Sequence, residues 1–435
     1  MKHRAPAPAP DSMLWARDDV PLPQFVGGNA VRLLTGGDEL FPAMCAAIDA
    51  AQHEVWFATY IFHHDDASRH VAETLVAAAA RGVNVRVVID GFGSISTLAK
   101  VRPWLNVPGL HLEVFRPLDR WYSWLQPGQL RRLHQKMCAV DGVVAFVGGI
   151  NVVDDRHDMT HGWTDLPRLD FAVEVRGPLA ASVQSATRAM WARANLGHGW
   201  REEVRSLANS AAPVAQTLRL LRSLRQKPLD VDLSGAIDAS DELRPVRAAF
   251  IVRDNFRQRR AIERSYVEAI RSARSHVDIA VPYFYPGRAF RRALRLAAKR
   301  GVQVRLLLQG KVDYRIAAMA AQALYEELFA FGVRIFEYTP AFLHAKVAVV
   351  DDDWATVGSS NIDPLSLLLN LEANVVVHDT EFARSLGVAL EAAFAVSTEV
   401  KSAVAQSGWR GLVHRGVVAW LANVYLRMAG ITGRY

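Results

Sequence analysis

A pattern of five residues occurs twice in this chain at identical spacing. His, Lys, Asp, Gly and Asn stand at the same offsets in HQKMCAVDGVVAFVGGIN (residues 134–151) and in HAKVAVVDDDWATVGSSN (residues 344–361). Each fixed position matches by chance about one time in 20 at average amino-acid usage, so chance is a poor explanation of two complete copies. A long internal repeat of this kind predicts two similar halves.

The residues around each copy predict a β-hairpin. Side chains at i and i+2 share a face only on a strand, so the His-x-Lys step favours extended backbone. The apolar runs MCAV (137–140) and VAVV (347–350) follow, and Asp141-Gly142 is a dipeptide typical of hairpin turns. We therefore expect a strand, a turn that carries the Asp, a second strand, and a tight corner that leads into the Asn.

Two such copies supply the side chains that phosphodiester exchange needs. A neutral imidazole can attack phosphorus, and a second imidazole can protonate the departing oxygen. An ammonium group is a point charge suited to phosphate oxygens, on which negative charge builds up during the reaction. The candidate catalytic residues are therefore His134, Lys136, His344 and Lys346. One copy alone would also fit a surface His and Lys on an ordinary hairpin.

The duplicated HxKxxxxD signature resembles that of the phospholipase D superfamily. The run WATVGSSNIDPLSLLLNLEANVVVHD (354–379) is also similar to bacterial cardiolipin synthases, specifically the B type without N-terminal membrane spans. The resemblance covers residues from about 28 to 400 and is specific at both motifs. It implies an enzyme, a phosphatidyltransferase that joins two phosphatidylglycerol molecules into cardiolipin through a phosphatidyl-histidine and releases glycerol. It implies no metal and no other cofactor.

The resemblance also implies a role for each motif residue. His134 is expected to attack phosphorus, and His344 to act first as the acid and then as the base. Because the two motifs are nearly symmetric, the sequence does not settle which His is the nucleophile. Asn151 and Asn361 are expected to bind the phosphate oxygens together with the two lysines.

Four acids near the motifs are further candidates. Asp141 and Asp351 belong to the catalytic signature, but Asp is also a turn former, so alternatively they stabilise the motif without touching substrate. Asp170 and Glu372 each open a strand, 36 and 28 residues past the motif His of the same half. In the superfamily, an acid at this place hydrogen-bonds the His ring and orients it, as in a triad. The alternative is an acid exposed to solvent at a strand start.

Both halves show the same order of helices and strands. Residues 46–62, 75–91 and 109–115 match residues 268–284, 294–310 and 331–338. Alternating helices and apolar strands predict an α/β sheet covered on both faces. We expect two tandem phospholipase D-like α/β/α sandwich halves, related by pseudo-two-fold symmetry that brings the two motifs together. The expected units are a flexible tail (1–27), the first half (28–200), a linker (201–247), the second half (248–400) and an amphipathic membrane-associating segment (401–435).

Two segments predict contact with a bilayer. Residues 116–132 contain a 13-residue insertion relative to the second half and mix Arg with Trp121, Tyr122 and Trp124. Residues 408–435 carry Trp409 and Trp420, and their longest uncharged run has 11 residues, too short to span a bilayer. Such mixtures of aromatic and basic side chains suit the membrane interface. Packing against the body of the protein is the alternative for both segments.

The charge balance indicates anionic partners. The net charge is +7 and the isoelectric point is near 9.5, which suits nucleic acid or an anionic bilayer. The aromatic insertion and the amphipathic end favour the bilayer, since DNA needs neither. We expect phosphatidylglycerol and an anionic membrane surface as partners, no nucleic acid, and a peripheral position on the cytoplasmic face of the cell inner membrane. A phospholipid hydrolase, another phosphatidyltransferase and, less favoured, a nuclease stay as alternatives. The sequence does not give the oligomeric state.

Overall fold

The computed structural model describes most of both halves. It covers residues 23–117, 131–158, 161–208, 245–253, 260–311, 324–363, 366 and 370–401. Most of the tail and of the linker lies outside these residues, and so do Trp121, Tyr122, Trp124, Trp409 and Trp420. The expectations for those segments therefore stay predictions.

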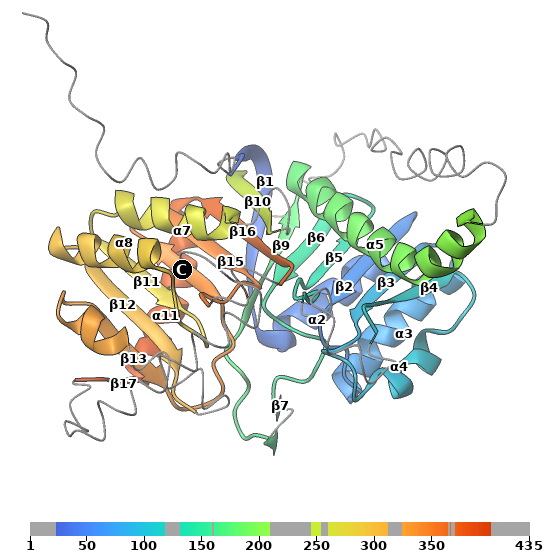
Figure 1. The fold of residues 1–435 in the computed structure, drawn as a ribbon, viewed down its shortest axis with the longest axis horizontal. Coiled ribbons are helices and arrows are strands. Elements are labelled where there is room, and N and C mark those ends of the chain that lie inside the picture. The colour runs from blue at the N-terminus through green and yellow to red at the C-terminus, as the bar shows by residue number, and fades with distance from the viewer. Residues whose placement is uncertain are drawn as a thin grey trace, which may run out of the picture.

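One large mixed sheet runs through the described part of the molecule (Figure 1). In the first half its strands lie in the order β4 (Leu110–Phe115), β3 (Asn84–Asp90), β2 (Glu54–Thr59), β5 (Met137–Val140), β6 (Val144–Gly148), β9 (Phe171–Arg176) and β1 (Val26–Thr35). Strands β2, β3 and β4 are parallel, and helices make the crossovers that parallel neighbours require. The first motif supplies the antiparallel hairpin β5–β6 beside β2.

The second half repeats this order in reverse across the sheet. From the centre outward its strands are β10 (Val246–Arg253), β16 (Glu372–His378), β15 (Trp354–Gly358), β14 (Val347–Val350), β11 (His276–Ala280), β12 (Gln303–Gln309), β13 (Arg334–Tyr338) and the short β17 (Thr398–Glu399). The halves join where β1 pairs antiparallel with β10. The expected tandem α/β halves with pseudo-two-fold symmetry are thereby confirmed, and the symmetry axis passes between β1 and β10.

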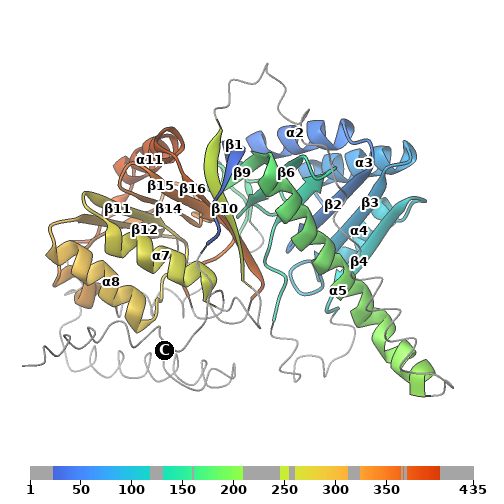
Figure 2. The same cartoon turned by 90° about the horizontal axis from the view of Figure 1, so that it is seen from above.

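Helices cover both faces of the sheet (Figure 2). In the first half α2 (Gly36–Asp49), α3 (Asp66–Ala80) and α4 (Leu98–Leu105) lie on one face, and the long α5 (Pro178–Ala208) crosses the other. In the second half α7 (Ala261–Ser272) and α8 (Arg288–Lys299) lie opposite α11 (Thr380–Ala395). The strands are buried between these layers, which explains their nearly continuous apolar sequences.

The boundaries of the halves differ slightly from those expected. The first half was expected to end at residue 200, but α5 continues to Ala208. The second half begins with β10 at Val246, two residues before the expected start at 248. The expected linker, residues 201–247, thus includes the end of α5 and the first residues of β10, and the division into units stays a prediction.

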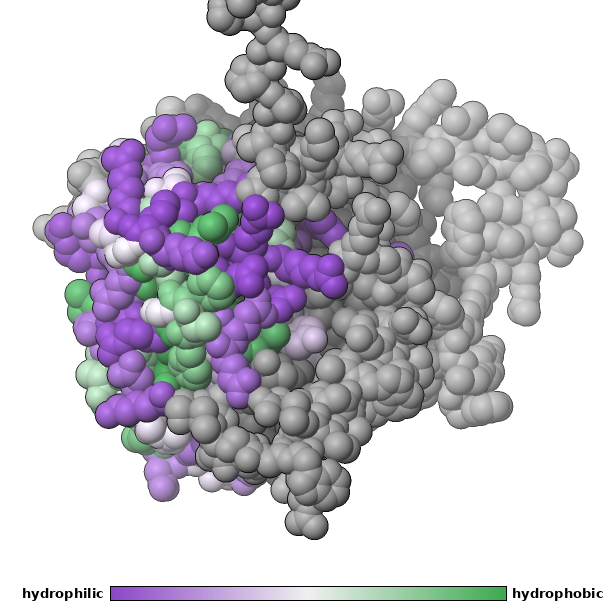
Figure 3. All heavy atoms as spheres, turned by 60° about the vertical axis from the view of Figure 1, so that its left-hand side comes forward, coloured by the Kyte–Doolittle hydropathy of each residue, from purple (hydrophilic) through white to green (hydrophobic). Residues whose placement is uncertain are grey.

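The side of the second half that faces the viewer in Figure 3 is largely hydrophilic, with small hydrophobic patches between hydrophilic residues. Arg291 and Arg295 of α8 both bind Glu327, so part of the basic charge of this helix is paired. Within the described residues, no helix combines the length and the apolar character needed to cross a bilayer.

Candidate active site

The two motifs place their His and Lys side chains at the start of equivalent strands. Lys136 directly precedes β5 and Lys346 directly precedes β14. The His-x-Lys step thus lies in the segment that leads into the strand, slightly earlier than the sequence pattern indicated. The imidazoles stand two residues before the lysines, just before the N-terminal ends of these two interior strands.

Each motif histidine is bound by an acid from the other half. His134 Nδ1 lies 3.0 Å from an oxygen of Glu372, and His344 Nδ1 lies 2.5 Å from an oxygen of Asp170. The sequence spacing had suggested a pairing within each half. Because both acids are buried and ionised acceptors, each imidazole donates its Nδ1–H and keeps Nε2 for chemistry.

Backbone hydrogen bonds create this exchange. The His134 amide donates to the Leu371 carbonyl at 3.0 Å, and the His344 amide donates to the Leu169 carbonyl at 2.8 Å. Leu133 and Leu343 form parallel bridges to the same two leucines. The residue after each bridged leucine is the acid, so each acid is delivered to the opposite histidine. The two motifs therefore share one site at the junction of the halves.

The residues that follow β6 and β15 contact the two acids in different ways. A Cβ on Gly149 would stand 2.3 Å from Asp170 Oδ1, so only glycine fits there. Ser359 holds the equivalent place in the second half, and its hydroxyl donates to Glu372 at 2.5 Å. The Ser359 carbonyl also lies 3.1 Å from His134 Nδ1. The additional side chain at the His134 pair is thus Ser359, whereas at the His344 pair it is Lys346, whose Nζ lies 2.8 Å from His344 Nδ1.

The two lysines are buried beside the histidines. Each Nζ donates to the carbonyl of the motif His, and Lys136 Nζ also lies 5.3 Å from the centre of the Tyr60 ring. Burial lowers the pKa of Lys136 to about 7, with the charge of Lys346 adding to the effect. Burial likewise lowers the pKa of Lys346 to about 8. The charged form of each lysine would bind phosphate oxygens favourably, and a bound phosphate would raise the pKa of both lysines again.

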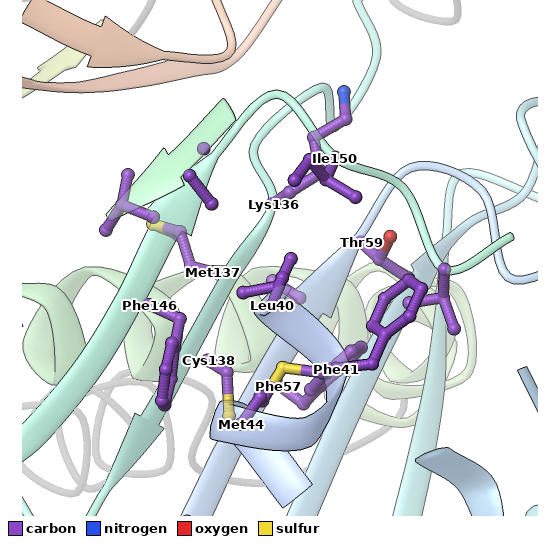
Figure 4. A pocket seen from close by; sticks show the side chains of 15 residues that line it. Leu40, Phe41, Met44, Phe57, Thr59, Lys136, Met137, Cys138, Phe146 and Ile150 are labelled. Carbon is purple, nitrogen blue, oxygen red and sulfur yellow. The ribbon is translucent and has the colours of Figure 1, made fainter. Parts of the chain in front are cut away.

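A small apolar cavity lies beside the Lys136 side chain. Its volume is about 20 Å³, enough for roughly one water, and it lies between α2 and the strands β2, β5 and β6. Figure 4 shows Lys136 and Thr59 at one end of this cavity, and Met44 and Cys138 at the other. The lysine thus has a low-dielectric region behind it, which disfavours its charged form.

Burial also lowers the pKa of both histidines. For His134 the nearby Lys136 and Lys346 add to burial, and Glu372 opposes it. For His344 burial and Lys346 bring the pKa to about 3, against the pull of Asp170. Both imidazoles are therefore neutral near pH 7 before substrate binds. A phosphate anion between them would raise the pKa of the histidine that must act as the acid.

The two asparagines differ in the hydrogen bonding of their side-chain oxygens. Asn151 Oδ1 accepts a hydrogen bond from the Ile61 amide at 3.3 Å. Asn361 Oδ1 is buried and lacks a partner among the described residues. A buried polar atom without a partner indicates that a substrate group completes the site there.

Comparison with known proteins identifies the family. The model of the cardiolipin synthase, phospholipase D-like domain matches residues 44–161 and 266–393, one segment in each half. Cardiolipin synthase B of Escherichia coli K12 is 36% identical over 369 residues, which cover 82% of this chain and 79% of that protein. The chain belongs to the cardiolipin synthase family. The expectation of a phosphatidyltransferase of the phospholipase D superfamily is confirmed at this level.

A second curated relative and one solved structure are also similar to this chain. Cardiolipin synthase A of Pseudomonas putida GB-1 is 32% identical over 363 residues, covering 82% of this chain and 67% of that protein. The crystal structure of phosphatidylserine synthase from Haemophilus influenzae covers 94% of this chain and 96% of its own, with a TM-score of 0.59 and 12% identity. The latter likeness shows the fold alone.

Asp141 and Asp351 of the family signature lie at the opposite end of the motif strands from the histidines, and we propose the structural alternative for both. Each sits in the turn at the far end of its motif strand, with φ of 51°. Asp141 accepts three backbone N–H groups from residues 52–54 at 2.7 to 2.9 Å. Asp351 does the same for residues 274–276. These carboxylates fasten the motif hairpin to the start of the neighbouring strand, as the structural alternative had it.

Two positioning residues were missed by sequence reasoning. Asp90 accepts the Leu133 amide at 2.8 Å, and Gln309 accepts the Leu343 amide at 2.9 Å. Each holds the residue directly before a motif histidine. They end the equivalent strands β3 and β12, but an acid in one half and an amide in the other hid the correspondence.

The two ends of the first-half insertion, residues 116–117 and 131–132, lie next to the first motif. Arg116 donates to the Arg131 carbonyl at 3.0 Å, and Arg132 donates to the Arg116 carbonyl at 3.2 Å. The Arg132 carbonyl in turn accepts the Leu371 amide at 2.9 Å. The insertion is therefore rooted two residues before His134.

Proposed function

We propose that the protein is a cardiolipin synthase that transfers a phosphatidyl group from one phosphatidylglycerol to the hydroxyl of a second. The observation that carries the proposal is the exchange of acids between the halves. It supports one site with two histidines, each with Nδ1 fixed and Nε2 left to react. Family membership supports phospholipid substrates.

In the first step, His134 Nε2 attacks the phosphorus of the donor lipid. The bound phosphate anion favours uptake of a proton from solvent at His344 Nε2. The bond from phosphorus to the terminal glycerol oxygen breaks, and that oxygen takes this proton from His344. Glycerol leaves, and a phosphatidyl-histidine remains. Glu372 stabilises the charge that forms on His134, since a carboxylate bound to Nδ1–H favours an imidazolium.

In the second step, His344 takes the proton of a hydroxyl on the second phosphatidylglycerol. That oxygen attacks phosphorus, the phosphorus–nitrogen bond breaks, and cardiolipin forms. Lys136 and Lys346 supply the positive charge for the phosphate oxygens in both steps. The buried Oδ1 of Asn361 needs a hydrogen-bond donor, and a hydroxyl of the lipid's glycerol headgroup can supply it.

We further propose that the site works against an anionic bilayer. A hairpin of β7 (His157–Asp158) and β8 (Gly162–Trp163) lies in sequence between Asn151 and Asp170 and projects from the body (Figure 1). Trp163 is 67% exposed and Leu166 is 50% exposed. Exposed Trp and Leu on a projecting hairpin suit the membrane interface. The cytoplasmic face of the inner membrane stays a prediction.

The test is to incubate purified full-length protein with phosphatidylglycerol vesicles and to analyse the lipids. Equal amounts of cardiolipin and glycerol are expected from the wild type. His134→Ala and His344→Ala should form neither while keeping the wild-type circular dichroism spectrum. Phosphatidic acid as the main product would instead identify a hydrolase, and substantial cardiolipin from either variant would refute the two-histidine scheme.

A further inference from the structure

A second cluster of histidine and carboxylate side chains lies beside the first-half motif and takes no part in phosphoryl transfer. His63 and Asp65 stand on the loop between β2 and α3, and His157 begins the projecting hairpin. One ligand atom of each residue lies within 4.8 Å of the other two. We propose that these three residues bind a divalent transition-metal ion such as Zn²⁺, which clamps the hairpin to the body.

The distances fit such an ion after a small closure. His63 Nδ1 lies 3.1 Å from Asp65 Oδ2. In a tetrahedral zinc site with bonds of about 2.0–2.1 Å, two ligand atoms stand about 3.3 Å apart. The His63–Asp65 edge therefore already has the required length. Only His157, whose ring centre is 4.5 Å from that of His63, has to approach.

The surroundings hold two of the ligands in place. The Asp65 carboxylate accepts the Ser68 amide at 2.8 Å and the Asp154 amide at 2.9 Å, and its side chain is 5% exposed. The His63 amide donates to the Val152 carbonyl at 2.8 Å. Backbone bonds to a ligating carboxylate are the support that metal sites use to orient their ligands.

His157 carries an independent sign of a missing partner. Its Nδ1 atom is buried and makes no hydrogen bond within the described residues. Its ring packs on Trp163, and its carbonyl accepts Arg168 at 3.0 Å, so the residue is fixed although this nitrogen is not used. A metal ion at the cluster would supply the partner.

The donor atoms suit a transition-metal ion. Two imidazoles and one carboxylate are a donor set typical of Zn²⁺, Co²⁺ or Ni²⁺ and are a poor match for Mg²⁺.

The position gives the ion a role in arranging the active site. The loop that carries His63 also donates from Ile61 to Asn151. The hairpin that carries His157 reaches the second half, where the His161 ring lies 5.2 Å from the Phe342 ring, two residues before His344. A metal between loop and hairpin would hold the exposed Trp163 and the mouth of the site in one arrangement.

The experiment is a calorimetric titration of Zn²⁺ into full-length, tag-free protein that has been stripped with chelator. The wild type is expected to bind one Zn²⁺ per chain and to gain about 2 °C or more in Tm. His157→Phe keeps the ring on Trp163 but removes the ligand, so it should lose both effects while keeping the metal-free Tm. His70→Ala, which removes an exposed histidine of α3, is the matched control and should behave like the wild type.

Three outcomes would overturn the proposal. The first is wild-type protein without saturable Zn²⁺ binding in the micromolar range. The second is His157→Phe that binds Zn²⁺ as tightly as the wild type. The third is Mg²⁺ that competes equally with Zn²⁺, since the donor set does not support that preference. Because all readouts are binding and stability, they are independent of whether the protein makes cardiolipin.

Discussion

Glu372 in the second half holds His134 in the first half, with 3.0 Å between its carboxylate oxygen and the ring Nδ1. Asp170 holds His344 in the reverse direction. Neither half therefore contains a complete acid–histidine pair. The catalytic unit is the whole two-half molecule, and its geometry depends on the junction between β1 and β10.

The exchange of acids can be read by NMR. Glu372→Gln should move the ring nitrogen signals of His134 and leave those of His344 nearly unchanged, and Asp170→Asn should do the reverse. Each variant should lower kcat by roughly 10²- to 10⁴-fold, because the imidazole loses its orientation and its charge partner. A shift confined to the histidine of the same half would contradict the exchange.

Asp141 should matter for stability and not for chemistry. Asp141→Ala removes the acceptor of three backbone N–H groups and should lower the free energy of unfolding by about 1–3 kcal/mol. The folded fraction should keep most of its kcat. Asp141→Asn keeps an acceptor oxygen and tolerates the positive φ, so it serves as the control in urea unfolding. Lost turnover at unchanged stability would return Asp141 to the catalytic set.

Gln309 should act through the backbone that carries His344. Gln309→Met has a similar size but leaves the Leu343 amide without its acceptor, so kcat should fall by about tenfold with little change in KM. Gln309→Glu restores an acceptor oxygen and the charge that Asp90 has in the first half, so it should recover most of the loss. Equal activity of the wild type and Gln309→Met would show that this contact does not position the histidine.

The pH dependence follows from the buried lysines and histidines. Lys136 and Lys346, with pKa values lowered to about 7 and about 8, lose their charge as pH rises, so kcat/KM should fall over this range. On the acid side, kcat/KM should fall only below the ordinary histidine range, because burial lowers the pKa of His134, which must be neutral to attack phosphorus. The side chain in Lys136→Arg stays charged, so the fall of kcat/KM on the basic side should move to higher pH. A flat profile from pH 5 to 9 would contradict both assignments.

The projecting hairpin should contribute to membrane binding. Trp163→Ser together with Leu166→Ser should weaken binding to vesicles of phosphatidylglycerol by about tenfold or more, since two exposed apolar side chains would no longer enter the interface. Co-sedimentation with vesicles measures this. Val388→Ser, a change at an exposed apolar residue of α11 in the second half, is the control. Unchanged sedimentation of the double variant would remove the hairpin from the contact surface.

Much of the site could be predicted from the sequence, because the repeat places equivalent residues at the same offsets in both halves. The matched offsets of His134 and His344 predicted two equivalent hairpins, and the helix–strand order predicted two sandwich halves. The acids at positions 170 and 372 were found as strand starts. Their exchange was not, because the partner of each acid depends on how the halves pack, and no spacing within one half contains that information.

Other features of the site depend on local geometry that the sequence does not show. The signature aspartates are close to His and Lys in sequence, yet a four-residue strand separates each of them from the motif histidine and lysine. Asp90 and Gln309 differ in type, so the repeat did not reveal them. The cluster of His63, Asp65 and His157 joins a loop to a hairpin about 90 residues later, and only the folded chain brings these side chains together.

A crystal structure of the full-length protein with orthovanadate, which mimics the phosphorus centre during transfer, tests the shared site most directly. One vanadate is expected, bonded to Nε2 of one motif histidine, in hydrogen-bond reach of Nε2 of the other, and contacted by both lysines. Two separate vanadates, or one vanadate that contacts only the histidine of a single half, would contradict a common phosphoryl-transfer centre.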